Sequence, residues 1–174
     1  MRPIALLFTA LAWLGGCATS AEPPSAPEAG RLTLRQALVI PPGAATVRLQ
    51  YGKIVAFNAV QEHDPFCVFE IETVAPGEQR VNPAGYAITR IVRSVETIAG
   101  APAPRPVRVA FNDDGGPSHI YFKTTFRLRD PAGQARALTC MSNQFAPGIP
   151  IMRHLTATEI RQALGDLITL EYRL

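Results

Sequence analysis

The sequence predicts a mainly β domain, an antiparallel sandwich or small barrel with one short C-terminal helix. Three observations lead to this fold class. Apolar and polar residues alternate with a period of two along several runs, turn residues separate the runs at short intervals, and a helical spacing of apolar residues occurs near the C-terminus. The chain has 174 residues, which is the length of one ordinary domain.

The alternating runs are typical of strands that bury one face and expose the other. In one run, Val47, Leu49 and Tyr51 are expected to face the core, whereas Arg48 and Gln50 are expected to face solvent. The runs that we interpret as strands lie within 32–36, 47–51, 67–73, 120–129 and 136–141.

Clusters of Gly, Pro, Asn and Asp predict the turns between these strands. The expected turns lie at 41–43, 51–53, 76–77, 82–85, 112–116, 130–133 and 147–148. The turn at 130–133 should join 123–129 to 136–141 as a hairpin. This spacing of short strands predicts about eight strands in all.

One helix is expected near the C-terminus. Thr156 and Glu159 have the spacing of a capping box, apolar residues recur at helical intervals from Ile160, and Gly165 ends the segment. The residues after it, 167–173, return to strand character. We expect the helix to cover one open end of the sandwich and the last strand to complete a sheet.

The first residues have the order of a secretory signal. Arg2 provides a positive start, the apolar stretch 4–14 follows, and Gly15 and Gly16 are small residues of the kind that precede a cleavage site. The apolar stretch is too short to span a bilayer, which needs roughly 20 apolar residues.

The residues Leu14-Gly15-Gly16-Cys17 resemble the bacterial lipobox. In that motif the cysteine thiol is alkylated by a diacylglycerol, and cleavage makes this cysteine the N-terminus. The resemblance implies a lipoprotein signal peptide over 1–16 and lipidation of Cys17. Ala18 after the cysteine resembles the outer-membrane sorting pattern of Gram-negative bacteria, which implies an anchor facing the periplasm. The alternative is an ordinary signal peptide that is cleaved near 18–21.

The segment 17–30 is expected to be a flexible linker behind the lipidated cysteine. Residues 18–30 include three Pro and four Ala and no large apolar residue, so they have little to bury. As a coil the linker could reach about 20 Å. The single β-rich domain is then expected over 31–174.

The cysteine count agrees with an oxidising compartment. If Cys17 carries lipid, Cys67 and Cys140 are left as one pair, and we expect them to form a disulfide. Two alternatives remain open at this point: a buried pair of free thiols, or a nucleophilic Cys67 beside His63.

The charge distribution argues against nucleic acid as a partner. Lys and Arg number 17 against 14 Asp and Glu, and the cations are scattered along the chain, with no block longer than Arg127-Leu128-Arg129. A phosphate-binding face needs clustered cations, usually with aromatic stacking partners. We therefore expect no nucleic-acid binding.

Residues that could carry chemistry are few. His63, His119 and His154 are far apart in the sequence and match no local metal-ligand spacing, although a zinc site assembled in space stays an alternative. His119 and His154 are expected to be solvated residues at the starts of a strand and a helix. No catalytic, metal or cofactor-binding residue is therefore assigned.

Two acidic segments are further candidates for a site. Glu70 and Glu72 would share a strand face about 7 Å apart, which is compatible with a carboxylate pair, but outward Glu residues beside Arg are the commoner arrangement. The stretch 112–116 could face an ion, yet it lacks the twelfth-position carboxylate of a calcium loop, so a hydrated turn is favoured.

The stretch 66–70, Phe-Cys-Val-Phe-Glu after an Asp-Pro turn, is similar to small uncharacterised lipoproteins of Gram-negative bacteria. The resemblance extends over about 32–93 and implies an envelope location without any functional residue. The sequence thus predicts a lipid-anchored envelope protein that acts as a binding or structural module, with an envelope protein or a cell-wall component as partner. The alternative is an envelope hydrolase with an unrecognised site.

Overall fold

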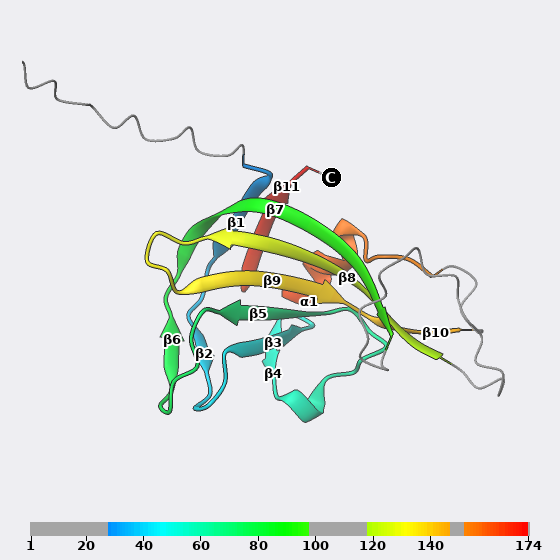
Figure 1. The fold of residues 1–174 in the computed structure, drawn as a ribbon, viewed down its shortest axis with the longest axis horizontal. Helices are drawn as coiled ribbons and strands as arrows, with labels where there is room; N and C mark the ends of the chain where they lie inside the picture. The colour runs from blue at the N-terminus through cyan, green and yellow to red at the C-terminus, as the bar shows by residue number, and fades with distance from the viewer. Residues whose placement is uncertain (1–27, 98–117, 147–151, 174) are drawn as a thin grey trace, which may run out of the picture.

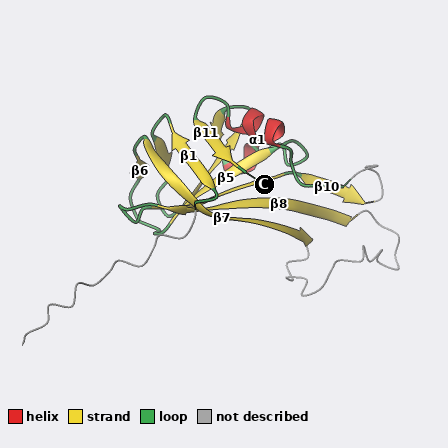
Figure 2. Ribbon diagram, turned by 90° about the horizontal axis from the view of Figure 1, so that it is seen from above, coloured by secondary structure: helices red, strands yellow, loops and turns green. Residues whose placement is uncertain are grey.

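The computed structural model describes residues 28–97, 118–146 and 152–173. A curled antiparallel sheet forms most of this structure. The strands are β1 (Gly30–Leu34), β2 (Leu38–Ile40), β3 (Thr46–Gln50), β4 (Lys53–Val55), β5 (Phe66–Ile71), β6 (Gln79–Val81), β7 (Ala84–Thr97), β8 (Ser118–Arg129), β9 (Ala135–Met141), β10 (Asn143–Ala146) and β11 (Ile168–Tyr172). The helices are the 3-10 helix η1 (Phe57–Ala59) and the α-helix α1 (Ala157–Leu164). Figure 1 shows the sheet as a half-barrel, and Figure 2 shows α1 on its concave side.

The strand order of the large sheet is β11-β1-β7-β8-β9-β5-β3-β4, and β10 pairs with β8. All of these pairs are antiparallel, and β2 and β6 form a separate two-stranded sheet. The predicted mainly β fold with one short C-terminal helix is therefore confirmed. The predicted hairpin is present as β8 and β9, and the predicted last strand joins the sheet as β11 beside β1.

The core lies on the concave face of the sheet. Residues directly opposite each other in an antiparallel pair point to the same face. One row of such partners runs from Leu49 in β3 through Cys67 in β5 and Cys140 in β9 to Thr124 in β8. All four side chains are at most 1% exposed, so this row marks the floor of the core.

The disulfide between Cys67 and Cys140 is confirmed. The two cysteines are direct cross-strand partners, and their Cα atoms are 4.0 Å apart. The bond lies inside the apolar core, since neither cysteine is exposed. This excludes the alternative of two free thiols and that of a nucleophilic Cys67 thiol.

The predicted helix begins and ends as expected. Thr156 and Glu159 form a complete capping box, and Gly165 is the C-cap. The helix packs against β3, β5 and β11, and its buried residue Leu164 belongs to the main core. It therefore covers the concave face of the half-barrel instead of an open end. Within the described residues no helix has the length and apolar character needed to cross a membrane.

The predicted orientation of two residues in the third strand is wrong. Gln50 is buried at 1% exposure, whereas Tyr51 is 51% exposed. The strand ends at Gln50, and Tyr51 has a φ of 52° because it begins the turn to β4. Part of the turn predicted at 82–85 is also strand, since β7 begins at Ala84. The turns predicted at 112–116 and 147–148 lie outside the described residues.

Removal of the disulfide in the C67A/C140A double variant should lower the free energy of unfolding by about 4 kcal/mol, because the bond closes a loop with a sequence separation of 73. Urea unfolding followed by circular dichroism measures this difference. A reducing agent should destabilise the parent protein and leave the double variant unchanged. Equal stability of the oxidised parent and the variant would contradict the prediction.

Glu159 should make stability sensitive to acid. Hydrogen bonds from the Arg153 guanidinium, at 2.7 and 2.8 Å, lower the pKa of Glu159 to about 2. Because the folded-state pKa lies below the ordinary value of 4.5, the stabilisation is present above pH 4.5 and is lost as the pH falls toward 2.

The Glu159→Gln variant isolates this effect, because Gln preserves the capping box but carries no charge. Its unfolding free energy should fall below that of the parent at pH 6, and the two should converge near pH 2. Glu72→Gln is the matched control, since Glu72 is exposed and makes none of the ion pairs found in the described part of the chain. A constant difference between parent and Glu159→Gln from pH 6 to pH 2 would refute the assignment.

Candidate binding groove at the sheet edge

The β3–β4 hairpin sets the position of one edge of the sheet. Its loop is Tyr51-Gly52, and both residues have positive φ, as a two-residue hairpin turn requires. The Gly52 N–H donates to the carbonyl oxygen of Ala163 at 3.0 Å. A Cβ atom added to Gly165 would lie 2.4 Å from the Gly52 Cα, so this turn fits against the end of α1 only because both positions are glycine.

The loop after β4 is held by the buried side chain of Gln50. Its Nε2 donates to the Gln61 carbonyl at 2.8 Å, and its Oε1 accepts from the Gln61 N–H at 2.9 Å. This pair satisfies both polar ends of a side chain that is only 1% exposed. The glutamine thus fixes the path of the loop relative to β3.

Two further polar contacts fix the same loop to β8 and β10. Glu62 accepts hydrogen bonds from the Tyr121 hydroxyl at 2.7 Å and from the Asn143 Nδ2 at 3.3 Å. Burial and the hydrogen bond to Glu62 raise the pKa of Tyr121 to about 12, so the phenol stays a donor at neutral pH. The loop is therefore ordered by several independent bonds.

Phe57, at the start of η1, stands on the surface beside β3. Its side chain is 76% exposed, and the Arg48 guanidinium lies 4.2 Å from the ring centroid. Burial lowers the pKa of Arg48, and Glu62 opposes this shift. Ile54 of β4, 45% exposed, is a second large apolar side chain at this edge.

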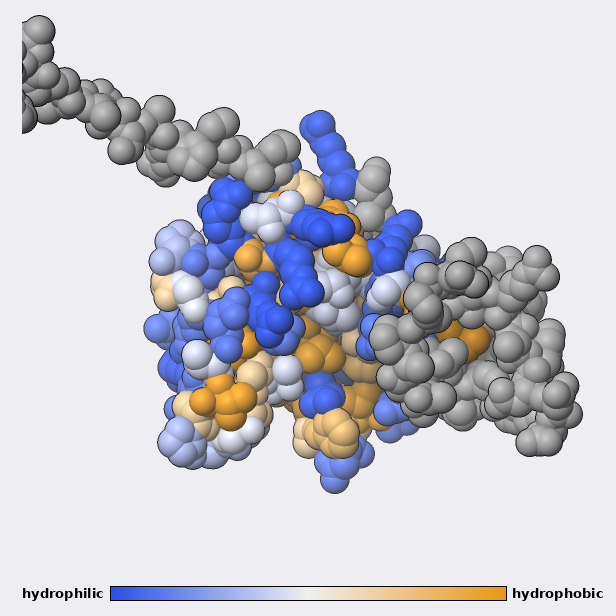
Figure 3. Space-filling view, in the orientation of Figure 1, coloured by the Kyte–Doolittle hydropathy of each residue, from blue (hydrophilic) through white to orange (hydrophobic). Residues whose placement is uncertain are grey.

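These residues border a groove of about 510 Å³ between β4 and the segment that follows β2. Its lining is mostly apolar and consists of Val39, Pro41, Ala44, Thr46, Val47, Arg48, Ile54, Val55, Ala56 and Phe57. Figure 3 shows hydrophobic surface along the lower edge of the molecule, where the segment with η1 and the ends of β2 and β6 lie in Figure 1.

The groove follows an uncovered stretch of strand edge. β4 is the last strand in its sheet order, and it pairs with β3 only at residues 48–50. Thr46 and Val47 therefore have β5 on one side and, within the described chain, no strand on the groove side. An edge of this kind presents backbone donors and acceptors that an added strand can use.

The three histidines that the sequence singled out come from different elements. His63 Nδ1 lies 3.4 Å from the Asn143 carbonyl oxygen, and His119 lies in β8. His154, expected to be solvated, is half-buried: its ring packs edge-on against Phe122, and its Nε2 lies 3.2 Å from the Ser94 carbonyl oxygen. This burial lowers the pKa of His154.

The two glutamates considered as a carboxylate pair do not share a strand. β5 ends at Ile71, before Glu72, and its pairing with β9 is irregular between Glu70 and Ile71. Glu70 instead pairs with Arg136 at 3.2 Å on the sheet surface. Among the residues described, no group of three or more His, Cys, Asp or Glu could hold a metal ion. Cys17 and the stretch 112–116 lie outside those residues.

Sequence reasoning did not identify Ile54, Phe57 or the groove between them. The available signal was the run Ile-Val-Ala-Phe at 54–57, which is apolar but lacks the alternation of a half-buried strand. Comparison of the chain with protein-family models, with curated proteins and with solved structures finds no match in any of the three.

Proposed function

We propose that this protein is a lipid-anchored envelope protein whose β4-edge groove binds an extended, apolar segment of another envelope protein. Lipid on Cys17 would hold it in the outer membrane, with the folded domain in the periplasm. The observation that carries the binding role is the mostly apolar groove of about 510 Å³ beside an uncovered strand edge.

The groove favours an extended polypeptide over a small ligand. A peptide added beside Thr46 and Val47 would gain main-chain hydrogen bonds, and its side chains would meet apolar walls. Covering Phe57 and Ile54 would also remove apolar surface from water, which contributes about 25 cal/mol per Å². Both contributions need a partner with apolar residues in a strand conformation.

Two features support the envelope location. The first is the resemblance of residues 14–17 to a lipobox. The second is the disulfide between Cys67 and Cys140, since such bonds persist in oxidising compartments such as the periplasm. The hydrolase alternative is less well supported, because the Cys67 sulfur that lies near His63 in sequence is bonded to Cys140 and offers no thiolate nucleophile.

Binding in the groove should depend on Phe57. A photo-crosslinking residue at position 55 should capture a partner segment in intact cells, and a synthetic peptide of that segment should bind the purified parent protein. Phe57→Ser should weaken this binding by about tenfold, since it removes an apolar wall contributing more than 1 kcal/mol. Calorimetry measures both affinities.

Val74→Ser is the matched control, because Val74 is 64% exposed but does not line the groove. A peptide methylated on alternate backbone nitrogens should also lose affinity if it pairs as a strand. The proposal would be contradicted if the parent and Phe57→Ser bound the peptide with equal affinity, or if backbone methylation left the affinity unchanged.

The anchor is tested through Cys17. Cys17→Ser should accumulate as the unprocessed precursor of 18.8 kDa, because a serine cannot accept the diacylglycerol. Intact-mass analysis of the parent should show a diacylated and N-acylated cysteine as its first residue, and labelled palmitate should be incorporated only by the parent. A mature parent protein that starts beyond residue 17 without lipid would exclude the anchor.

A further inference from the structure

The convex face of the sheet brings together arginines that are far apart in the sequence. Arg90 of β7 is the direct partner of Arg127 in β8, and Arg31 of β1 and Arg129 of β8 flank the same β7 residue, Ala87. Direct partners share a face, and residues two apart on one strand do so as well. We call these four residues, Arg31, Arg90, Arg127 and Arg129, the arginine face.

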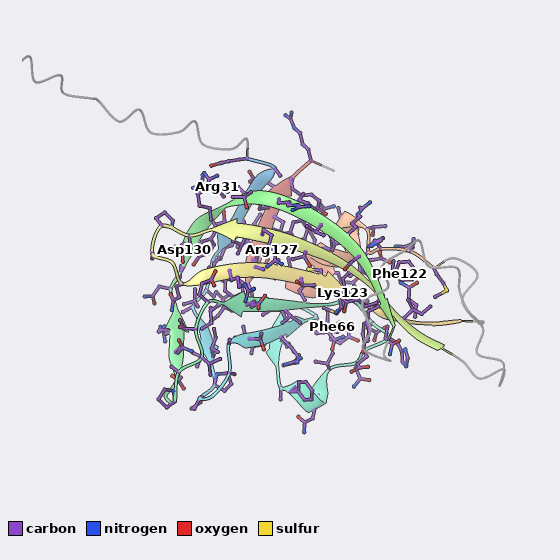
Figure 4. All side chains as sticks on the ribbon, viewed as in Figure 1. Arg31, Phe66, Phe122, Lys123, Arg127 and Asp130 are labelled. Atoms are coloured by element: carbon purple, nitrogen blue, oxygen red, sulfur yellow. A yellow bond between two sulfur atoms is a disulfide. The ribbon has the colours of Figure 1, made fainter. Side chains whose placement is uncertain are left out.

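The opposite orientation of their neighbours shows that this is the outer face. Ile88, beside Ala87, and Phe126, beside Arg127, are fully buried in the core. Arg31, Arg90 and Arg127 are exposed. Figure 4 shows Arg31 and Arg127 on the curved sheet, and Figure 3 shows hydrophilic side chains gathered over β1, β7 and β8.

Small residues form the floor beneath these cations. A Cβ atom added to Gly85 would lie 2.8 Å from the Arg31 Nη2, so the Arg31 side chain crosses β7 directly over Gly85. Ala87 lies between Arg31 and Arg129 in the register. The guanidinium groups can therefore lie low over the sheet and form one broad cationic surface.

Within the described residues no ion pair neutralises these four arginines, although Glu171 of β11 is the direct partner of Arg31 and lies on the same face. The pairs found among the described residues are Lys123–Glu96, Arg136–Glu70 and Arg153–Glu159, and none of them involves the arginine face. The carboxylate of Asp130, next to Arg129, accepts three backbone N–H groups of its own turn. Like charges placed directly opposite each other, as Arg90 and Arg127 are, destabilise a strand pair, and a bound anion relieves that repulsion.

We infer that the arginine face binds the anionic phospholipid headgroups of the membrane that carries the anchor. This inference rests on the proposed lipid anchor. The linker 17–30 joins the domain at Gly30, the first residue of β1, directly beside Arg31. A flexible linker of this length would reach about 20 Å and would keep this face close to the bilayer. Each cation near an anionic bilayer surface strengthens binding to that surface about fivefold. The effect falls off over the Debye length, which is about 8 Å at physiological ionic strength.

A membrane fits this face better than a nucleic acid does. Proteins that bind single strands combine cations with aromatic rings on which bases stack. Here the floor consists of Gly85 and Ala87. The face is also convex. Proteins that bind single strands hold the nucleic-acid backbone in a groove, whereas a convex face suits a broad, fluid surface of headgroups.

The test uses the full chain, purified from detergent-solubilised membranes and placed in nanodiscs of phosphatidylcholine with or without phosphatidylglycerol. Phenylglyoxal modifies accessible arginines, and mass spectrometry reports each residue. The arginine face should react at least roughly threefold more slowly in the anionic discs, and about 0.5 M NaCl should remove this protection. Arg153, which is exposed before α1 and contacts Gln144 of β10, should react equally in both discs.

The double variant R127Q/R129Q should lose the protection of Arg31 and Arg90, whereas R153Q should retain it. Equal reactivity in the two kinds of disc, or protection that is the same in both and insensitive to salt, would overturn the inference. Protection by a short single-stranded DNA and not by anionic discs would also overturn it, in favour of nucleic acid.

Failure of the anchor is recognised separately. Intact mass shows whether the purified chain carries lipid. A chain without lipid is mixed with the same two kinds of disc, and its arginine modification is measured in the same way. Absence of lipid contradicts the proposed anchor. Equal arginine reactivity in the two kinds of disc contradicts the role of this face.

Discussion

The bond between Cys67 and Cys140 joins β5 to β9, two neighbouring inner strands that link the two halves of the sheet. β5 leads on to β3 and β4, and β9 leads on to β8 and β7. The bond lies in the row of core residues that includes Leu49 and Thr124, and α1 packs over the same concave side. Because it joins residues far apart in sequence, it limits the freedom of the unfolded chain as well as fixing the register of the fold.

The curl of the sheet divides the molecule into surfaces of different chemistry. Apolar side chains point inward and are closed off by α1, so the charged partners on the same strands must point outward. Because β7 and β8 pair over their length, their outward arginines come together on the convex face. Ile54 and Phe57 fall outside this alternation and stay exposed, where β4 ends early and the chain turns into η1.

Local signals in the sequence predict the elements that depend on neighbouring residues. The capping box at Thr156, the hairpin around 130–133 and the alternation in β8 each require only a few adjacent positions. The disulfide followed from cysteine parity. The orientation of Tyr51 could not be predicted by alternation alone, because the strand ended one residue before the apolar pattern did.

The candidate sites depend instead on the order of strands in space. The cations are dispersed when they are counted along the chain, yet the register leaves only β7 between Arg31 of β1 and Arg129 of β8. No short-range pattern contains that information, because the paired strands β1 and β7 lie more than fifty residues apart in the sequence. The groove likewise arises between β4 and the segment after β2, which meet only once the sheet has formed.

The two proposed surfaces are compatible with one orientation on a membrane. The expected linker would enter at β1, near one end of the strand order, whereas the groove lies beside β3 and β4 at the other end. Six strand spacings separate β1 from β4, which is about 29 Å along the curved sheet. With the arginine face against the headgroups, the β4 edge would lie away from the point of attachment. A strand of a partner protein could then enter the groove without first displacing the domain from the bilayer.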